Sequence, residues 1–570
     1  MKNYILIFFI ALVGVSIYIP SLSNSFVWDD HTIIEQNPSI RAPSILYVFT
    51  HPFLTPGFAQ ENSIYYRPIT MFSFWFIYKI FGDSPLFFRL LSFLFHFIAI
   101  ILVYVLARKF LNFESAIVAM AFFALNPVHT ESVCFPSAIS DIIVAVFLLG
   151  SVIVYISEKR WATFVAPILW LFAVLAKENA AMGIIAIVLY DILFRQGIKL
   201  KNKLFRWGMW IVALIICFVL RINALGGFGF GEISMPLGKR IFFAPYLLSR
   251  YFLNLFLPFD IKVLHPESPN TLTFTMLAVG IVGIIIIALL IVYLIRKKDK
   301  VAQLGIYWVI IFIIPVLGIV GISTTLWSDR FLYVPSVGGA ILIGFIWQKY
   351  GKDSIKNVSY ILLIAYFLFF SISSVSYAFY WRDDNTLYRQ MIKDAPTQPK
   401  GYSGMSGIFI NKNLPDSAYY YAHKAVDVEP NYLPAMILLA QLQMQKNNLD
   451  SAKYYLDKAI DMYPNYVYCY ENLGLYWISK GDTTLATKYF IKAHQIAPHD
   501  YIVNKNLGVA LISLGDTTSG IELLKRACIY YPEGVEAQFE LLDFYYSLGD
   551  TTKVKELLDK YPQLWQFIRK

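Results

Sequence analysis

Residues 464–498 read PNYVYCYENLGLYWISKGDTTLATKYFIKAHQIAP, and residues 498–532 read PHDYIVNKNLGVALISLGDTTSGIELLKRACIYYP. The two stretches align without a gap at a spacing of 34 residues, so that Asn472-Leu-Gly474 corresponds to Asn506-Leu-Gly508. Each stretch is long enough for two short helices, and the small residues suit the point where such helices cross. We therefore expect a pair of packed helices that repeats along the chain.

The 34-residue period extends over five units at the carboxyl-terminal end of the chain. A period of 34 residues is the signature of the tetratricopeptide repeat (TPR), whose arrays bind other chains on a concave face. We expect residues 386–570 to form a TPR array of about five repeats that binds a protein. The residues that keep the period are Pro396, Pro430, Pro464, Pro498 and Pro532, together with Gly481, Gly515 and Gly549, each followed by aspartate.

The chain before residue 385 has a different character, with long apolar runs. Over the whole chain 57% of residues are hydrophobic and only 15% are charged, and the mean hydropathy of +0.55 exceeds that of soluble globular proteins. We therefore predict an all-α integral membrane protein, with a polytopic body over residues 1–385 followed by the TPR solenoid.

Apolar runs of membrane-spanning length predict about eleven transmembrane helices. Residues 1–20 are interpreted as a retained first span, because they lack a clear small-residue cleavage site. The predicted spans are residues 4–20, 86–107, 116–134, 140–157, 161–176, 180–194, 207–225, 272–295, 302–321, 332–348 and 357–376.

Charge predicts the orientation of these spans. The net charge is +10, and the region after residue 398 is near neutral, so the basic surplus lies in the membrane body. It fits the positive-inside rule better than a nucleic-acid surface. This orientation puts the first loop (residues 22–85) and the TPR array on the extracytoplasmic side. Residues 241–258 are apolar enough to be a further span; we interpret them as a re-entrant or interface-lying helix on that side.

Asp29 and Asp30 are adjacent carboxylates at the outer end of the first predicted span. Charge near lipid is costly and therefore points to function. An aspartate can act as a general base toward a hydroxyl or help to hold a divalent metal ion. The structural alternative is a solvated loop or a helix cap.

Further charged residues lie in the predicted external loops or at the outer ends of other spans. Arginine suits phosphate because its planar guanidinium offers several charge-assisted hydrogen bonds. Each residue also has a structural alternative: an ion pair between Lys177 and Glu178, a turn around His129, or anchoring of an arginine at the membrane surface. No nucleotide-binding or zinc-protease motif occurs in the sequence, which favours a donor held in the bilayer. The residues are Arg67, His129, Glu131, Lys177, Glu178, Asp329 and Arg330.

Several motifs, taken in order along the chain, resemble those of the transmembrane-and-tetratricopeptide-repeat O-mannosyltransferases, which are GT-C glycosyltransferases. Residues 246–267 resemble the middle segment of that family, and Trp381-Arg-Asp-Asp-Asn-Thr-Leu387 resembles its junction into the repeats. The other motifs are Phe26-Val-Trp-Asp-Asp30, Tyr66-Arg-Pro-Ile-Thr70, Asn126-Pro-Val-His-Thr-Glu131, Ala176-Lys-Glu178 and Asp329-Arg-Phe-Leu-Tyr-Val-Pro-Ser336.

The resemblance implies an inverting enzyme that moves a monosaccharide, mannose or a similar hexose, from a polyprenyl- or dolichyl-phosphate sugar to serine or threonine on proteins. Asp29 or Asp30 would be the base, and we favour Asp30. A divalent metal ion is a candidate cofactor. The implied site comprises the catalytic carboxylates Asp29, Asp30 and Glu131, the donor-phosphate cations Arg330, Lys177 and Arg67, and the supporting residues His129, Glu178 and Asp329.

Other functions stay open at this stage. A GT-C enzyme with a glycan or lipid acceptor keeps the same chemistry, and a membrane scaffold that displays the repeats needs no catalysis. A transporter is a further alternative. The Lys-, Ile- and Asn-rich composition suggests a bacterial inner membrane, with the endoplasmic reticulum as the location if the chain is eukaryotic. The short repeat array and short external loops depart from the family and leave the donor sugar and the acceptor open.

Overall fold

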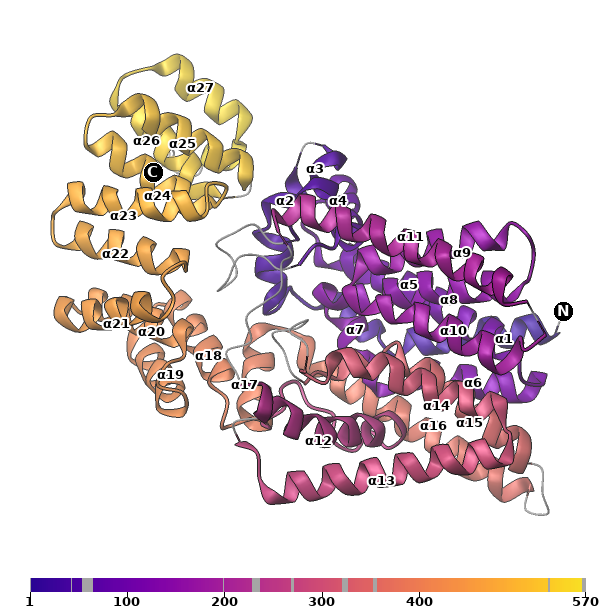
Figure 1. The fold of residues 1–570 in the computed structure, drawn as a ribbon. Coiled ribbons are helices and arrows are strands. Elements are labelled where there is room, and N and C mark those ends of the chain that lie inside the picture. The colour runs from indigo at the N-terminus through magenta and orange to yellow at the C-terminus, as the bar shows by residue number, and fades with distance from the viewer. Residues whose placement is uncertain are drawn as a thin grey trace. The chain divides into compact units, whose positions relative to one another are not determined.

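A computed structural model describes residues 2–42, 44–53, 65–197, 199–227, 236–267, 271–319, 327–351, 356–531 and 534–565. Within these ranges the secondary structure is helical, without strands, as the all-α prediction requires. Contacts divide the chain into two units (Figure 1). One comprises Met1–Asp30 and Tyr66–Pro396, and the other comprises His31–Tyr65 and Thr397–Lys570.

The first unit is a membrane body built from helices of very different length. Its helices are α1 (Lys2–Ser16), α4 (Pro68–Phe81), α5 (Pro85–Ala107), α6 (Phe113–Leu125), α7 (Thr130–Cys134), α8 (Ile139–Ile156), α9 (Ala162–Ala176), α10 (Gly183–Phe194), α11 (Leu200–Leu225), α12 (Leu237–Phe256), α13 (Phe274–Lys297), α14 (Lys300–Ile313), α15 (Pro335–Tyr350), α16 (Lys356–Ala378) and α17 (Asp384–Asp394).

Five helical segments in the described residues are long and apolar enough to cross a membrane, and a bent pair (α6 and Pro127–Cys134, 46° apart) could form a sixth. Three remaining predicted spans, 4–20, 161–176 and 302–321, correspond to shorter apolar helices, and the last of them runs into residues outside the described ranges. Spans 180–194 and 332–348 correspond to α10 and α15. The count of eleven therefore stays a prediction. The five segments are Pro85–Ala107, Pro136–Ile156, Leu200–Leu225, Phe274–Lys297 and Val358–Trp381.

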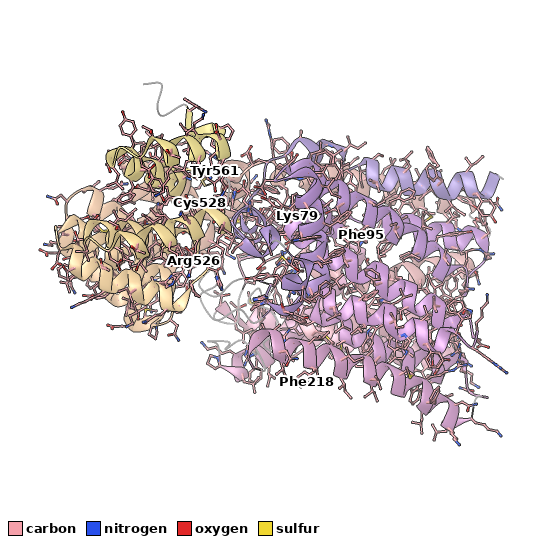
Figure 2. All side chains as sticks on the ribbon, turned by 90° about the horizontal axis from the view of Figure 1, so that it is seen from above. Lys79, Phe95, Phe218, Arg526, Cys528 and Tyr561 are labelled. Carbon is pink, nitrogen blue, oxygen red and sulfur yellow. The ribbon has the colours of Figure 1, made fainter. Side chains whose placement is uncertain are left out.

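The surfaces of α11 and α13 are consistent with contact with lipid. Only 11% of the apolar window of α11 and 17% of that of α13 is buried inside the protein, against 67% for Pro136–Ile156. Phe218 on α11 is 41% exposed (Figure 2), and Ile286 on α13 is 60% exposed. Apolar surface of this extent is rare on soluble proteins, which supports embedding of the body in a membrane.

Helix α12 packs along α13 through two glycines. A Cβ atom on Gly280 would lie 2.7 Å from the Tyr246 nitrogen, and one on Gly283 would lie 1.9 Å from the Ser249 hydroxyl. Small residues thus let the two helices approach closely. Helix α12 covers the segment that we interpreted as re-entrant or interface-lying; it is not among the five candidate spans, and its relation to the membrane stays a prediction.

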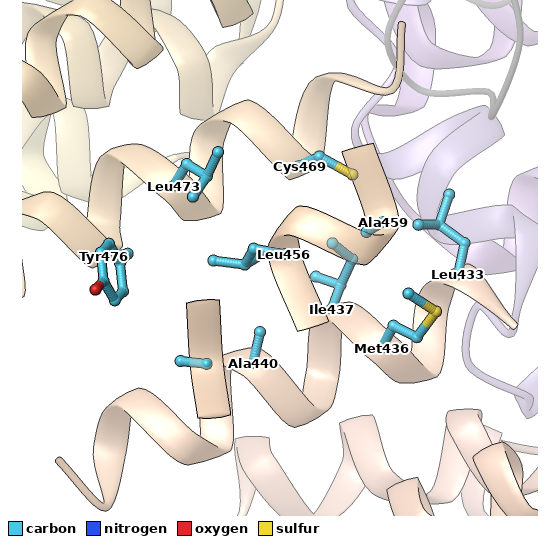
Figure 3. Close-up of a cluster of buried hydrophobic side chains, with 10 residues drawn as sticks. Leu433, Met436, Ile437, Ala440, Leu456, Ala459, Cys469, Leu473 and Tyr476 are labelled. Atoms are coloured by element: carbon cyan, nitrogen blue, oxygen red, sulfur yellow. The ribbon is translucent and has the colours of Figure 1, made fainter. Parts of the chain in front are cut away.

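The second unit contains the repeats. Their first helices pack on the second helices of the same repeat, and the cluster around Leu456 and Leu473 in Figure 3 joins α20, α21 and α22 into a continuous core. This is the predicted solenoid of helix pairs. The pairs are α18 (Pro399–Asn411) with α19 (Pro415–Val428), α20 (Leu433–Gln445) with α21 (Leu449–Met462), α22 (Val467–Ser479) with α23 (Thr483–Ile496), α24 (Tyr501–Ser513) with α25 (Thr517–Tyr530), and α26 (Val535–Ser547) with α27 (Thr551–Lys560).

The recurring Gly-Asp dipeptide ends one helix of a repeat and begins the next. Gly481 adopts a left-handed conformation (φ +79°), which favours glycine. The Asp482 carboxylate then accepts a hydrogen bond from the Leu485 N–H at 2.9 Å and caps α23. The same arrangement recurs at Gly515-Asp516 and Gly549-Asp550, and this local requirement explains the sequence period.

Residues 31–65 belong to the same unit as the repeats. The domain boundary predicted from the sequence, at residue 385, had placed them in the membrane domain. This segment contains α2 (Pro38–Arg41) and α3 (Ile45–Thr50). The Arg41 guanidinium lies over the Tyr531 ring, 5.0 Å from its centroid, and also donates to the Ile34 and Asn37 carbonyls at 3.1 and 3.3 Å. Arg41 and Tyr531 are too far apart in sequence for their cation–π contact to be predicted from local sequence patterns.

We predict that Gly474→Ala destabilises the array by about 1–3 kcal/mol, because a Cβ atom there would lie 2.3 Å from the buried Phe490 ring. Gly407→Ala is the matched control: the added Cβ meets nothing within 4 Å, and alanine favours the helix by up to about 1 kcal/mol. Protease-resistance melts of the full-length protein measure both. Equal shifts for the two variants would contradict the close contact.

Candidate active site

Asp30 is fully buried and is tied into the fold by both carboxylate oxygens. Its Oδ1 accepts hydrogen bonds from the Ser137 N–H at 2.9 Å and the Ser137 hydroxyl at 2.5 Å, and its Oδ2 accepts one from the Val27 N–H at 3.2 Å. Burial raises the pKa of Asp30 to about 7, although Ser137 and the nearby Arg89 act in the opposite direction. These contacts give Asp30 the character of a positioning residue.

Asp29 is half-buried, and its carboxylate makes no hydrogen bond or ion pair with any residue that the structure describes. It therefore has both oxygens available to an incoming hydroxyl group. The surroundings of the two aspartates therefore favour Asp29 over Asp30 as the candidate base. This reverses the preference for Asp30 that was drawn from the sequence.

Arg89 on α5 holds the segment that leads to this pair. Its guanidinium donates to the carbonyls of Asn24 and Ser25, both at 2.5 Å, and to the carbonyl of Cys134 at 3.2 Å. The sequence analysis missed this residue. The sequence nevertheless marks Arg89, because an arginine inside an apolar span is energetically costly without a specific partner.

Glu131 on α7 binds the segment around Arg330. One carboxylate oxygen accepts from the Ser328 hydroxyl at 2.6 Å and from the Arg330 N–H at 3.2 Å, and the other lies 3.2 Å from the Arg330 Nη1. The structure thus brings together two residues that the sequence selected separately. In this arrangement Glu131 holds the cation instead of standing free as a base.

Lys177 forms a buried ion pair with Asp141 at the start of α8. The Lys177 Nζ lies 2.6 and 2.7 Å from the two oxygens of Asp141, and 5.1 Å from the Phe331 ring centroid. Burial lowers the pKa of Lys177 to about 8; Asp141 partly offsets this, and the charges of Arg67 and Arg330 lower it further. The three cations chosen from the sequence are therefore within electrostatic reach of one another.

The ion pair between Lys177 and Glu178, considered as the structural alternative, is wrong. Lys177 has extended backbone (φ −161°, ψ 139°), so adjacent side chains diverge. Glu178 instead accepts from Arg67 Nη2 at 2.9 Å and from Arg221 Nη1 at 3.3 Å. Burial alone would raise the pKa of Glu178, but the two arginines hold it below its usual range.

Arg221 on α11 was not selected from the sequence, although it too lies within a predicted span. With it, Lys177, Arg67 and Arg330 form ion pairs with the carboxylates of Glu131, Glu178 and Asp141. This set is called the cation cluster below. Several cations gathered in one place favour a bound anion.

His129 and Asp329 make their hydrogen bonds outside the cation cluster. His129 is fully buried, with its Nε2 2.8 Å from the Ser336 hydroxyl and its ring 4.5 Å from the rings of Phe123 and Tyr333. Its supporting role is thus one of packing. The predicted turn is present as the single 3₁₀ turn Pro127–His129.

Asp329 joins its own segment to the middle segment of the chain. Its Oδ1 accepts from the Asn254 side-chain amide and its Oδ2 from the Lys262 N–H, both at 3.3 Å, and the His265 Nε2 lies 3.5 Å away. These contacts fix the residue that precedes Arg330. Among the described residues no group of three His, Cys, Asp or Glu side chains is placed to hold a metal ion.

Two protein-family models match the chain. The model described as dolichyl-phosphate-mannose-protein mannosyltransferase matches residues 67–221, which include Arg67, Glu131, Asp141, Lys177 and Arg221. A tetratricopeptide-repeat model matches residues 409–468. The first match covers most of the cation cluster, and the second confirms the repeats.

Curated relatives confirm the resemblance noted in the sequence. Protein O-mannosyl-transferase F38B6.6 of Caenorhabditis elegans is 23% identical over 74% of this chain and 62% of its own length. Protein O-mannosyl-transferase TMTC3 of Homo sapiens is 23% identical over 74% of this chain and 52% of its own length, and human TMTC4 is 24% identical over 71% and 63%. The chain therefore matches about half to three fifths of these relatives' length.

A solved TPR protein of Thermus thermophilus covers 30% of this chain at 18% identity, with a TM-score of 0.28 and 96% of its own length covered. Likeness at this level is too low to support a functional inference.

We predict that Asp30 contributes a pH-dependent term to stability. Its pKa is near 4 in the unfolded chain and about 7 when folded, so its contribution is full below about pH 4 and is lost as the pH rises through about 7. The melting temperature of wild type minus that of Asp30→Asn should therefore fall between about pH 4 and 7. Asp416→Asn, at an exposed carboxylate, is the control. A difference that does not change with pH would contradict the raised pKa.

We also predict that Lys177→Met destabilises the protein by about 3–5 kcal/mol, because Asp141 stays buried without its partner. The double variant Lys177→Met, Asp141→Leu should recover most of this loss, since both charges are then absent. Lys446→Met breaks the exposed pair with Asp416 and should change stability by less than about 1 kcal/mol. Denaturant unfolding in detergent measures all three, and a double variant as unstable as the single one would contradict the pairing.

Proposed function

We propose that the protein is a polytopic glycosyltransferase that transfers mannose or a similar hexose from a polyprenyl- or dolichyl-phosphate sugar to serine or threonine hydroxyls of proteins, on the extracytoplasmic face and with inversion. The observation that carries the proposal is the cation cluster, two of whose carboxylates, Glu131 and Asp141, flank the Ser137 that binds Asp30. The family match and the named relatives support the same chemistry.

The cation cluster would bind the donor phosphate. A lipid-phosphate sugar is a phosphodiester with one negative charge, which cations of this cluster would attract. When the bond from the anomeric carbon to the phosphate oxygen breaks, the leaving phosphate gains a second negative charge. Arg330 and Arg67, both already oriented by carboxylates, would stabilise that charge as it develops.

Asp29 would act as the general base. Its carboxylate takes the proton of the acceptor hydroxyl while the hydroxyl oxygen attacks the anomeric carbon from the face opposite the phosphate. This single displacement inverts the configuration at that carbon. Asp30, fixed by Ser137, would set the orientation of its neighbour, and such positioning is a large part of catalysis.

Other parts of the chain are suited to the lipid tail of the donor and to the acceptor protein. The exposed apolar surfaces of α11 and α13 are suited to a polyprenyl tail. The TPR array would hold the acceptor protein, since solenoids of this type present extended binding surfaces.

We predict that Asp29→Asn lowers the transfer rate by about 10²- to 10⁴-fold, because a general base contributes that much. The assay uses full-length protein in liposomes, polyprenyl-phosphate mannose and a Ser/Thr peptide, with the mannosylated peptide measured by mass spectrometry. Glu158→Gln, at an exposed carboxylate outside both the candidate site and the array, is the control and should transfer at the wild-type rate. A folded Asp29→Asn protein with full activity would exclude this base.

The same preparation separates the proposal from the alternatives. Wild-type transfer to a lipid or glycan acceptor and not to peptide would assign the other GT-C acceptor class. In cells, deletion should remove a hexose from Ser or Thr of external proteins; loss of a polysaccharide instead would favour that alternative. Wild-type protein that transfers to neither acceptor would favour the scaffold.

A further inference from the structure

The junction Trp381-Arg-Asp-Asp384 is hydrogen-bonded to the segment that carries the Asp29-Asp30 pair. The Asn24 side-chain amide donates to the Trp381 carbonyl at 3.0 Å. The Ser25 N–H and hydroxyl both donate to the Arg382 carbonyl, at 3.1 and 3.2 Å. These contacts join positions more than 350 residues apart. They show that the junction motif holds the segment before Asp29 in place, a role outside the steps of the proposed reaction.

The contact nearest to the candidate base is made by Asp384. Its carboxylate accepts a hydrogen bond from the Trp28 N–H at 2.9 Å, and Trp28 directly precedes Asp29. Trp28 has a left-handed backbone (φ 51°), which a bulky residue adopts only when its surroundings hold it there. Its ring also stacks on Phe135, with centroids 5.8 Å apart and planes 9° apart.

Phe135 in turn stacks on Trp381, 4.9 Å between centroids. The Trp28 backbone and ring are thus both held, directly or through Phe135, by the junction. We propose that Asp384 is a positioning residue, which sets the orientation of Asp29 by holding the Trp28 N–H in this left-handed turn. The inference rests on the proposed function, because it treats Asp29 as the base.

The neighbouring Asp383 has a separate and ordinary task. It caps α17, with its carboxylate accepting from the Thr386 N–H at 2.8 Å. Asp384 lies in the first turn of the same helix, where a carboxylate also interacts favourably with the helix dipole. A purely structural role for Asp384 would therefore be helix stabilisation, and Asp383→Asn is the matched control because asparagine caps as well as aspartate.

The first test is amide hydrogen exchange on the intact, full-length protein. Asp384→Ala should speed exchange at Trp28 by about tenfold or more, since this amide loses its acceptor. Asp383→Asn should leave it within about twofold, because it leaves the acceptor in place. Native protection of Trp28 in Asp384→Ala would overturn the proposal.

The second test is kinetic and separates positioning from stability. Asp384→Ala should lower kcat by about tenfold or more while the donor KM stays within about twofold, because the cation cluster is untouched. The kcat of Asp384→Asn should lie between that of wild type and that of Asp384→Ala, since the asparagine amide oxygen still accepts the hydrogen bond but carries no charge. If the alanine variant does not fold, the asparagine variant alone must show reduced kcat with unchanged donor KM.

The outcomes distinguish this inference from the function on which it rests. Active wild type together with full kcat in Asp384→Ala overturns the role of Asp384 and leaves the transferase intact. Faster exchange at Trp28 without any loss of kcat does the same. Wild-type protein that transfers no sugar overturns the proposed function, and the catalytic role of Asp384 with it.

Discussion

The break in the helix at Asn126 and Pro127 is the constraint on which the candidate site depends. Proline has no N–H to continue the helix, and the chain bends by 46° there. Asn126 stabilises the break, because its side chain accepts from the Val128 N–H and donates to the Leu255 carbonyl. After the break the chain forms the short helix α7 and the 3₁₀ turn Pro136–Ala138 before α8 begins at Ile139. Three side chains of this stretch and of the first turn of α8 hold the site: Glu131 binds Arg330, Ser137 binds Asp30, and Asp141 binds Lys177.

An irregular backbone and several charges within a membrane protein require partners for every polar group. Here the Cys134 carbonyl receives Arg89, and the Phe135 N–H returns to the Glu131 carbonyl. Each cation of the cluster lies against a carboxylate of the described residues. The site is thus held together by its own ion pairs, and several cations gathered in one place favour an anion such as the proposed donor phosphate.

The sequence predicts the repeats best, because their period follows from local requirements: Gly481 needs a left-handed turn, and Asp482 caps the helix that follows. It also selects most of the charged residues of the candidate site, since charge in an apolar chain is conspicuous. It does not predict their partners. The pairing of Lys177 with Asp141 depends on an extended residue after α9, and the roles of Asp29 and Asp30 differ because only one of them meets Ser137. Arg89 and Arg221 lie inside predicted apolar spans and were not selected, although their charge was the signal.

The path of the chain between the two units gives the candidate site a further constraint. The chain passes into the array unit directly after Asp30 and leaves it directly before Tyr66. A carboxylate of the base pair and Arg67 of the cation cluster therefore stand within two residues of these crossings. In the array unit the intervening segment is anchored by the contact of Arg41 with Tyr531. In the membrane body Arg89 binds the Asn24 carbonyl and Asp384 binds the Trp28 N–H. Within the membrane body these two contacts, and not the carboxylate of Asp29 itself, hold the backbone that carries Asp29.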